Sequence, residues 1–164
     1  MEERRPGLTT TLVHARADAQ GSGLAPPLER STTFRLDAEA EEALATRVGV
    51  DEIDTYGRFG CTTSRLAGAM VASVEGTPSG LVLSSGMAAV HATLMALVPA
   101  GGRVVAGEVL YGGTEEGLGR DLSARGVEVS RFDPGDPKSL DDALERPADL
   151  VWCEAISTPL LQVA

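Results

Sequence analysis

Apolar positions are concentrated between Leu81 and Leu97. The run Leu81–Leu83 is short and wholly apolar, which predicts a buried strand. The next three residues, Ser84-Ser85-Gly86, predict a tight turn. From Met87 to Leu97 there is no Asp, Glu, Lys, Arg, Gly or Pro, and Ala, Leu and Met dominate. This composition predicts a buried helix that begins directly after the turn.

Weaker patterns flank this segment. Residues 1–30 are rich in Gly and Pro and predict an extended arm with a short helix around Thr11–Ala17. Asp37 can cap a surface helix over 38–46, and residues 49–63 predict a loop. Three further strands are expected after the central helix. The predicted strands lie over 103–106, 127–132 and 150–153, and Ser31–Leu36 has some strand character. The predicted helices run over Ser64–Glu75, where Gly76 ends the helix, from the loop 111–114 to Arg125, where Gly126 ends it, and over 137–145.

Strands and helices alternate from Leu81 onward, which predicts a mostly parallel sheet with helices on both faces. Ligands of such sheets bind beyond the carboxyl ends of the strands. Three separate segments follow strand ends here and are expected to meet at one rim: Ser84–Met87, Val109–Tyr111 and Glu154.

Composition narrows the functional classes. The chain has 164 residues and a formal net charge of -10, which argues against a general binder of nucleic acids or anionic membranes. Cys61 and Cys153 form no zinc-binding pattern and no disulfide framework, and no metal site is expected. No apolar run approaches the roughly 20 residues that span a bilayer. These features, with a polar N-terminus, predict a cytoplasmic protein.

Two segments could bind an anion. The backbone N–H groups at the start of the helix after Ser85 offer a site for a phosphate or a carboxylate. The alternative is an ordinary strand-to-helix connection with a serine cap. Tyr56 and Arg58, in the glycine-interrupted loop, form a possible binding element. The alternative there is a tyrosine packed at the edge of the core and a solvated arginine.

Other catalytic motifs are missing. The chain contains neither the G-x-G-x-x-G nucleotide fingerprint nor a G-x-x-x-x-G-K-[ST] phosphate loop, and Ser85 is not in a G-x-S-x-G elbow. His91 falls one turn inside the apolar helix, where a core-packed histidine is expected rather than a base. His14 is expected to be a surface or packing histidine.

The motifs together resemble the Cys/Met metabolism family of pyridoxal-phosphate enzymes, which includes cystathionine γ-synthases and lyases and methionine γ-lyases. The resemblance covers almost the whole chain. It rests on P-L-E-R-S-T-T-F from Pro27 to Phe34, Y-x-R from Tyr56 to Arg58, the helix ending at Gly76, S-S-G-M-A-A from Ser84 to Ala89, Y-G-G-T from Tyr111 to Thr114, and Glu154.

The resemblance implies the N-terminal part of the aspartate-aminotransferase-like (fold type I) large domain. It implies an arm and loop at 1–60 that contact a neighbouring subunit, and an incomplete cofactor domain at 61–164. It further implies a homodimer or homotetramer, and a substrate such as cystathionine, methionine or an activated homoserine. The reaction class would be β/γ-elimination or γ-replacement in transsulfuration or amino-acid biosynthesis.

Residue roles follow from the same resemblance. The turn Ser85-Gly86-Met87 would hold the phosphate of pyridoxal 5'-phosphate, and Tyr56 with Arg58 would reach the phosphate in the neighbouring subunit. Tyr111 would stack on the pyridine ring and assist proton transfer as the catalytic residue. Glu154 would lie at the edge of the ring's pocket, and its alternative is a solvated carboxylate after a strand.

The sequence also departs from the family pattern. Cys61-Thr62-Thr63 stands where the family has Asn-Pro-Thr, and Thr158 stands where it has an asparagine. The chemistry requires a lysine that forms a Schiff base and an aspartate that holds the pyridine nitrogen, and the resemblance implies that both lie further along the chain than residue 164. Lys138, the sole lysine, follows a polar turn, where a solvated side chain is expected rather than the Schiff-base lysine. Leu160 and Leu161 are expected to form an exposed apolar edge.

Three functions remain open from the sequence. The first is a lyase or transferase of sulfur amino-acid metabolism that lacks its lysine region in this chain. The second is a non-catalytic, truncated remnant that binds the cofactor or phosphate, or that dimerises. The third is a generic α/β anion-binding domain, which explains the turn at Ser85 but not Tyr56, Arg58 and Tyr111 together.

Overall fold

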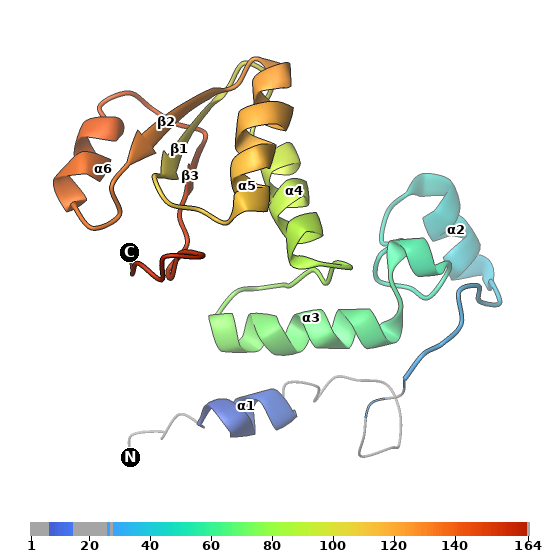
Figure 1. Ribbon diagram of the computed structural model, residues 1–164. Helices are drawn as coiled ribbons and strands as arrows, with labels where there is room; N and C mark the ends of the chain where they lie inside the picture. Colours follow the sequence, from blue (N-terminus) through green and yellow to red (C-terminus); the bar gives the residue numbers. More distant parts are fainter. Residues whose placement is uncertain (1–6, 15–25, 27, 164) are drawn as a thin grey trace. The chain divides into compact units, whose positions relative to one another are not determined.

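The computed structural model describes residues 7–14, 26 and 28–163. The chain divides into two compact units, Met1–Val82 and Leu83–Ala164. Figure 1 labels their helices and strands. The first unit is helical, and the second contains the sheet.

The first unit contains α1 (Leu8–His14), α2 (Ala38–Thr46), the 3₁₀ turn η1 (Gly57–Phe59) and α3 (Thr62–Glu75). Helix α1 lies against α3 (Figure 1). It begins three residues before the predicted helix 11–17, whose last three residues lie outside the described part. The predicted strand character over 31–36 amounts to one antiparallel bridge between Thr33 and Tyr56.

Helix ends in this unit follow local chemistry. Oδ1 of Asp37 accepts a hydrogen bond from the N–H of Ala40 at 2.9 Å, which confirms the predicted cap of α2. Gly76 ends α3 in the left-handed conformation, with φ of 67°. The start of α3 at Thr62 precedes the predicted start by two residues, because Cys61 and Ser64 form a capping box there.

The contact between α3 and the segment after it requires glycine on both sides. A Cβ added to Gly68 would lie 2.2 Å from the carbonyl oxygen of Gly80, and one added to Gly80 would lie 2.5 Å from the carbonyl oxygen of Gly68. The two backbones therefore touch directly. Only residues without side chains permit this approach.

The prediction of a buried strand over Leu81–Leu83 is wrong. The segment forms no strand, and Leu81 is 83% exposed. A strand needs a hydrogen-bonded neighbour, and the described residues supply none to this segment. An apolar run indicates that a segment favours burial, but it does not specify which other segment would bury it.

The second unit is built on a parallel sheet. Its described strands are β1 (Arg103–Gly107), β2 (Glu128–Phe132) and β3 (Leu150–Trp152), in the order β2-β1-β3. In register, Val104 of β1 lies opposite Val129 of β2 and Leu150 of β3. The three strands confirm three of the four predicted ones and the parallel α/β architecture.

Helices cover both faces of this sheet. Helix α4 (Gly86–Leu97) and the helical segment formed by α5 (Gly112–Glu116), η2 (Gly117–Leu122) and η3 (Ser123–Arg125) lie on one face (Figure 1). Helix α6 (Pro137–Ala143) packs against β2 on the other face (Figure 1). The segment from α5 to η3 contains a stretch of π-helix, and Gly126 ends it with φ of 73° as predicted.

The core lies between β1 and the two helical segments of the first face. Val104 and Ala106 of β1 are fully buried, and strand alternation directs both toward Leu94, Leu118 and Leu122. Complete burial of one leucine side chain contributes roughly 2 kcal/mol. The central position of β1 and the two helices packed on it hold the loops at the carboxyl ends of the strands.

Helix α4 is less buried than its sequence predicts. Leu94 is buried, whereas Leu97 is 56% exposed. His91 is not packed in the core: its side chain is 49% exposed, and Nδ1 lies 3.7 Å from Oδ2 of Asp121. The uniformly apolar sequence did not reveal which face would meet the sheet, because it has no polar stripe to mark the outer side.

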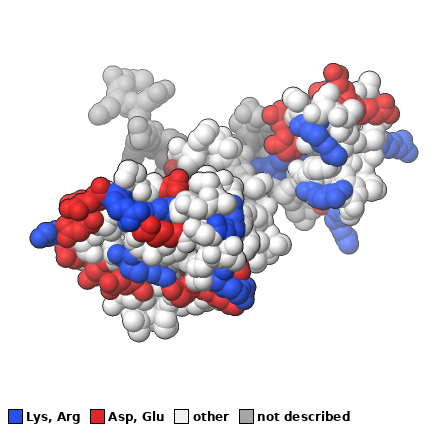
Figure 2. Space-filling model, turned by 90° about the horizontal axis from the view of Figure 1, so that it is seen from above, with Lys and Arg blue, Asp and Glu red and all other residues white. Residues whose placement is uncertain are grey.

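The charged side chains of the second unit are mixed in sign. On the face seen in Figure 2, Asp and Glu lie among Lys and Arg rather than in one large patch. Within the described residues, no helix combines the length and the apolar character needed to cross a membrane. Leu160 and Leu161 are 64% and 71% exposed, which confirms the predicted apolar edge.

Candidate functional site

The first turn of α4 presents free hydrogen-bond donors. Oγ of Ser85 accepts a hydrogen bond from the N–H of Ala88 at 3.1 Å, and the carbonyl oxygen of Ser85 accepts one from the N–H of Ala89. Among the described residues, no acceptor is paired with the N–H groups of Gly86 and Met87. Ser85 and Gly86 are exposed, and the first turn carries no acidic residue. A helix tip of this kind attracts an anion through its donors and its dipole.

Tyr111 and Glu154 meet at the carboxyl ends of β1 and β3. The N–H of Tyr111 donates a hydrogen bond to Oε1 of Glu154 at 2.9 Å. Tyr111 is 48% exposed, and Glu154 is partly buried. One carboxylate oxygen is therefore engaged by the backbone. The tyrosine residue itself remains accessible to a ligand.

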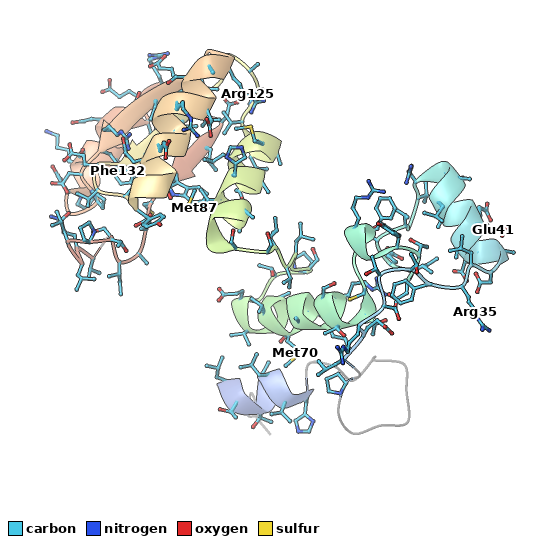
Figure 3. All side chains as sticks on the ribbon, turned by 45° about the vertical axis from the view of Figure 1, so that its right-hand side comes forward. Arg35, Glu41, Met70, Met87, Arg125 and Phe132 are labelled. Atoms are coloured by element: carbon cyan, nitrogen blue, oxygen red, sulfur yellow. The ribbon has the colours of Figure 1, made fainter. Side chains whose placement is uncertain are left out.

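Met87 connects this pair to α4. A Cβ added to Gly113 would lie 2.8 Å from Sδ of Met87 and 2.8 Å from Cε1 of Tyr111. Both side chains therefore pack closely around Gly113, at the start of α5. Figure 3 shows Met87, in the first turn of α4, next to α5. The helix tip, Tyr111 and Glu154 are thus neighbours, as the predicted rim requires.

The topology explains why these segments meet. Strand β1 lies between β2 and β3, and the chain leaves β1 through α5 toward one neighbour and returns through α6 to the other. Ligand sites in such sheets occur where the strand order reverses, beyond the carboxyl ends. The loops after β1 and β3, which carry Tyr111 and Glu154, flank that point.

Tyr56 and Arg58 lie in the first unit. The N–H of Gly57 donates to the carbonyl oxygen of Thr32 at 2.7 Å, which anchors the turn between them. Cζ of Arg58 lies 5.3 Å from the ring centroid of Tyr56 and 5.5 Å from that of Phe59. Both Tyr56 and Arg58 are exposed, and no carboxylate in the described ranges forms an ion pair with Arg58. The guanidinium is therefore supported by aromatic rings and its charge is not neutralised.

The structure thus forms two groups of predicted residues. One contains Ser85, Gly86, Met87, Tyr111 and Glu154 in the second unit, and the other contains Tyr56 and Arg58 in the first.

Sequence reasoning missed two contributors. Gly113 makes room for Met87 and Tyr111, and the glycine pair in Y-G-G-T was the available signal. Arg47, whose Cζ lies 5.3 Å from the Phe59 centroid, had no sequence signal because it is remote from the Y-x-R motif.

Comparisons with known proteins show the family to which the chain belongs. Residues 9–164 match the family model described as "Cys/Met metabolism PLP-dependent enzyme". The chain is 32% identical over 161 residues to L-methionine gamma-lyase of Pseudomonas putida. This match covers 97% of this chain and 40% of that protein.

Two solved structures also match over nearly the whole chain. The cystathionine gamma lyase of Micromonospora echinospora is 34% identical with a TM-score of 0.76, and the match covers 98% of this chain and 40% of that one. The cystathionine gamma synthase of Xanthomonas oryzae, solved in complex with aminoacrylate and cysteine, is 29% identical with a TM-score of 0.78 and the same coverage.

The chain spans about 40% of the length of these relatives. The match of 9–164 to the family model nonetheless covers most of the sequence, and TM-scores of 0.76 and 0.78 show that the backbone follows the same fold as the solved structures over that part. Over the part that it spans, the chain has the fold of the fold-type-I PLP enzymes, and it belongs to the family of Cys/Met metabolism PLP-dependent enzymes.

Proposed function

We propose that this chain is the N-terminal portion of a cytoplasmic pyridoxal-phosphate-dependent lyase or transferase of sulfur amino-acid metabolism. The whole protein would carry out β/γ-elimination or γ-replacement on cystathionine, methionine or an activated homoserine, as a homodimer or homotetramer. The family match and the methionine and cystathionine lyases among the relatives support this proposal. The single observation that carries it is the open tip of α4 beside Tyr111 and Glu154.

The residues at this tip suit the cofactor's phosphate. The N–H groups of Gly86 and Met87 have no acceptor in the described part of the chain, whereas the third donor, on Ala88, is already satisfied by Ser85. A Cβ added to Gly86 would meet nothing within 4 Å, so there is open space at the tip. Ser85, Gly86 and Met87 would bind the phosphate through backbone donors and the helix dipole.

Tyr111 and Glu154 suit the cofactor ring. The exposed ring of Tyr111 could stack on the pyridine, and its phenol could move a proton at its Oη. Glu154, held by the N–H of Tyr111, would fix the loop that carries this ring. When bound, pyridoxal phosphate supplies an electron sink that makes bonds near the amino-acid α carbon labile.

Arg58 and Tyr56 would serve the neighbouring subunit's cofactor. Their side chains are exposed and stacked on each other, and Arg58 has no ion-pair partner among the described residues. An exposed guanidinium without an ion-pair partner forms strong charge-assisted hydrogen bonds with phosphate. The local cation also offsets the net charge of -10.

A non-catalytic remnant is the second candidate function, and one observation favours it. Lys138, the sole lysine, is exposed on α6, where its backbone N–H donates to Oδ1 of Asp136 at 3.0 Å. No hydrogen bond or ion pair joins this lysine to Tyr111 or Glu154 in the described part of the chain. This chain by itself would bind the cofactor or phosphate, or dimerise. Catalysis would require the remaining part of the relatives' sequence, which this chain does not span.

The test is a pair of binding titrations of the 164-residue chain, one with pyridoxal phosphate and one with pyridoxal, in which fluorescence reports binding. We expect tighter binding of the phosphorylated form. Ser85→Asp keeps a good helix cap but adds a carboxylate next to the phosphate, so affinity should fall about tenfold, or about 1.4 kcal/mol, while stability is retained. Ser123→Asp, on the exposed start of η3, makes the same charge change and should leave affinity unaltered.

Equal affinity for both ligands, or an unaltered affinity in Ser85→Asp, would contradict the proposed phosphate site. Borohydride reduction followed by mass spectrometry separates the two candidate functions. A specific adduct on Lys138 would support autonomous chemistry. Binding without an adduct would support the non-catalytic alternative.

A further inference from the structure

Arg47 has an unusual backbone for a residue with a side chain. It follows the last residue of α2 with φ of 63° and ψ of 16°, and its N–H donates to the carbonyl oxygen of Ala43 at 2.9 Å. This left-handed position is the one that glycine usually occupies at a helix end. Arginine is disfavoured there, so its presence suggests that the side chain has a role.

That side chain is directed at the Y-x-R loop. Cζ of Arg47 lies 5.3 Å from the ring centroid of Phe59, and Cζ of Arg58 lies 5.5 Å from the same centroid. Arg58 also lies 5.3 Å from the Tyr56 centroid. Two guanidinium groups thus share one ring. In Figure 1 the loop that carries η1 lies beside α2, which brings these residues together within one unit.

The charges of these two arginines are not neutralised within the described residues. Arg65, on α3, pairs with Asp54, but no ion pair is formed by Arg47 or by Arg58. Arg58 and Phe59 line a groove of about 680 Å³, together with Asp51 and Glu52. Although these carboxylates line the same groove, neither pairs with Arg58. The Arg58 guanidinium therefore contacts two aromatic rings, and its donors remain available to a ligand.

We propose that Arg47 is a positioning residue for Arg58, acting through Phe59. This inference rests on the proposed function, in which Arg58 binds the phosphate of a neighbouring cofactor. The Arg47 guanidinium holds the Phe59 ring, and the ring holds Arg58 in one conformation. Because arginine loses much rotamer entropy when it binds, an arginine that is already ordered binds phosphate more tightly. The left-handed backbone at Arg47 points its side chain to the ring.

The decisive variant is Arg47→Gly. Glycine suits φ of 63°, so the stability of α2 should be equal to or above that of the original chain. The affinity for pyridoxal phosphate should nevertheless fall about two- to fivefold, the loss expected from one exposed cation–π contact. A purely structural role predicts that stability and affinity fall together. Arg47→Lys keeps a cation on the ring and should restore part of the affinity.

A double-mutant cycle tests the route through Phe59. In a Phe59→Leu background, Arg47→Gly should cause no further loss of affinity. Side-chain ¹⁵N relaxation of Arg58 Nε gives a readout that needs no ligand, and Arg47→Gly should make this group more mobile. An equal loss in both backgrounds, or unaltered Arg58 mobility, would overturn the inference.

Arg58→Ala separates this inference from the function on which it rests. If Arg58→Ala leaves the affinity for pyridoxal phosphate unaltered, the proposed phosphate role of Arg58 fails. The relaxation of Arg58 Nε then still decides whether Arg47 positions it. If Arg58→Ala weakens binding and Arg47→Gly does not, the phosphate role stands and the inference about Arg47 is wrong.

Discussion

The backbone N–H of Tyr111 donates a hydrogen bond to Oε1 of Glu154 at 2.9 Å, across 43 positions of sequence. This bond joins the loop after β1 to the loop after β3. It connects the residue proposed to contact the cofactor ring with a carboxylate on the neighbouring strand end. The geometry of the rim therefore depends on a contact that no local pattern specifies.

Glu154→Ala should weaken this connection. The Tyr111 N–H would lose its acceptor, and we expect the free energy of unfolding to fall by about 0.5–1.5 kcal/mol. Glu154→Gln keeps an oxygen acceptor and should stay close to the original chain. Urea unfolding of both variants is the measurement. Equal losses in the two variants would show that the charge of Glu154, and not the hydrogen bond, provides the stabilisation.

Gly113→Ala should disturb the packing of Met87 and Tyr111. The added methyl would lie 2.8 Å from atoms of both side chains, and overpacking of this kind costs about 1–3 kcal/mol. The flexible end of Met87 can move, so we expect the lower end of that range, with a displaced Tyr111 ring. Tyrosine fluorescence and thermal unfolding report the two effects.

Gly112→Ala is the matched control for this prediction. A Cβ at Gly112 meets nothing within 4 Å, and alanine favours helix, so the variant should be neutral or slightly stabilised. Gly113→Ala should therefore lower the free energy of unfolding, whereas Gly112→Ala should not. Equal behaviour would mean that the close contact at Gly113 does not determine the position of Tyr111.

Because Glu128 pairs with Arg146, we expect the free energy of unfolding to depend on pH. Its carboxylate accepts hydrogen bonds from Nη1 and Nη2 of Arg146 at 2.9 and 3.0 Å, and this pairing lowers the pKa of Glu128 below the ordinary value for a glutamate. Because the pKa is lower in the folded state, the pairing stabilises the protein above about pH 4.5. That contribution should be lost as the pH falls through the folded-state pKa.

The variant Glu128→Gln should flatten this acid dependence. Urea midpoints measured from neutral pH downward should differ most between the two proteins at neutral pH and converge in acid. Glu145→Gln, an exposed site without an ion pair among the described residues, serves as the control. A difference that persists unaltered at low pH would contradict the role of ionised Glu128.

Local chemistry made much of the fold predictable. Asp37, Gly76 and Gly126 end or begin helices where their side-chain or backbone preferences place them. Pro137 lies in the first turn of α6 as expected. The helix that starts after Ser85 and the three strands were also predictable, because each is encoded within a window of a few residues. The meeting of Ser84–Met87, Val109–Tyr111 and Glu154 followed from parallel topology.

The failures have a common physical origin. Leu81–Leu83 has the composition of a strand, yet no described segment pairs with it. His91 lies within an apolar helix, yet its side chain is half-exposed and close to Asp121. In both cases the outcome depends on which other element packs there, and that information is spread over residues distant in sequence.

By itself, the sequence determined the family motifs, the helix caps, the parallel α/β architecture and the candidate anion-binding helix tip. Only the tertiary structure decided that Tyr111 and Glu154 are hydrogen-bonded, that Met87 and Tyr111 both pack around Gly113, and that Arg47 reaches the Phe59 ring, which Arg58 also contacts. The reason is that caps and propensities act over one or two turns of chain. Contacts between side chains of different elements depend on packing, which no short window of sequence contains.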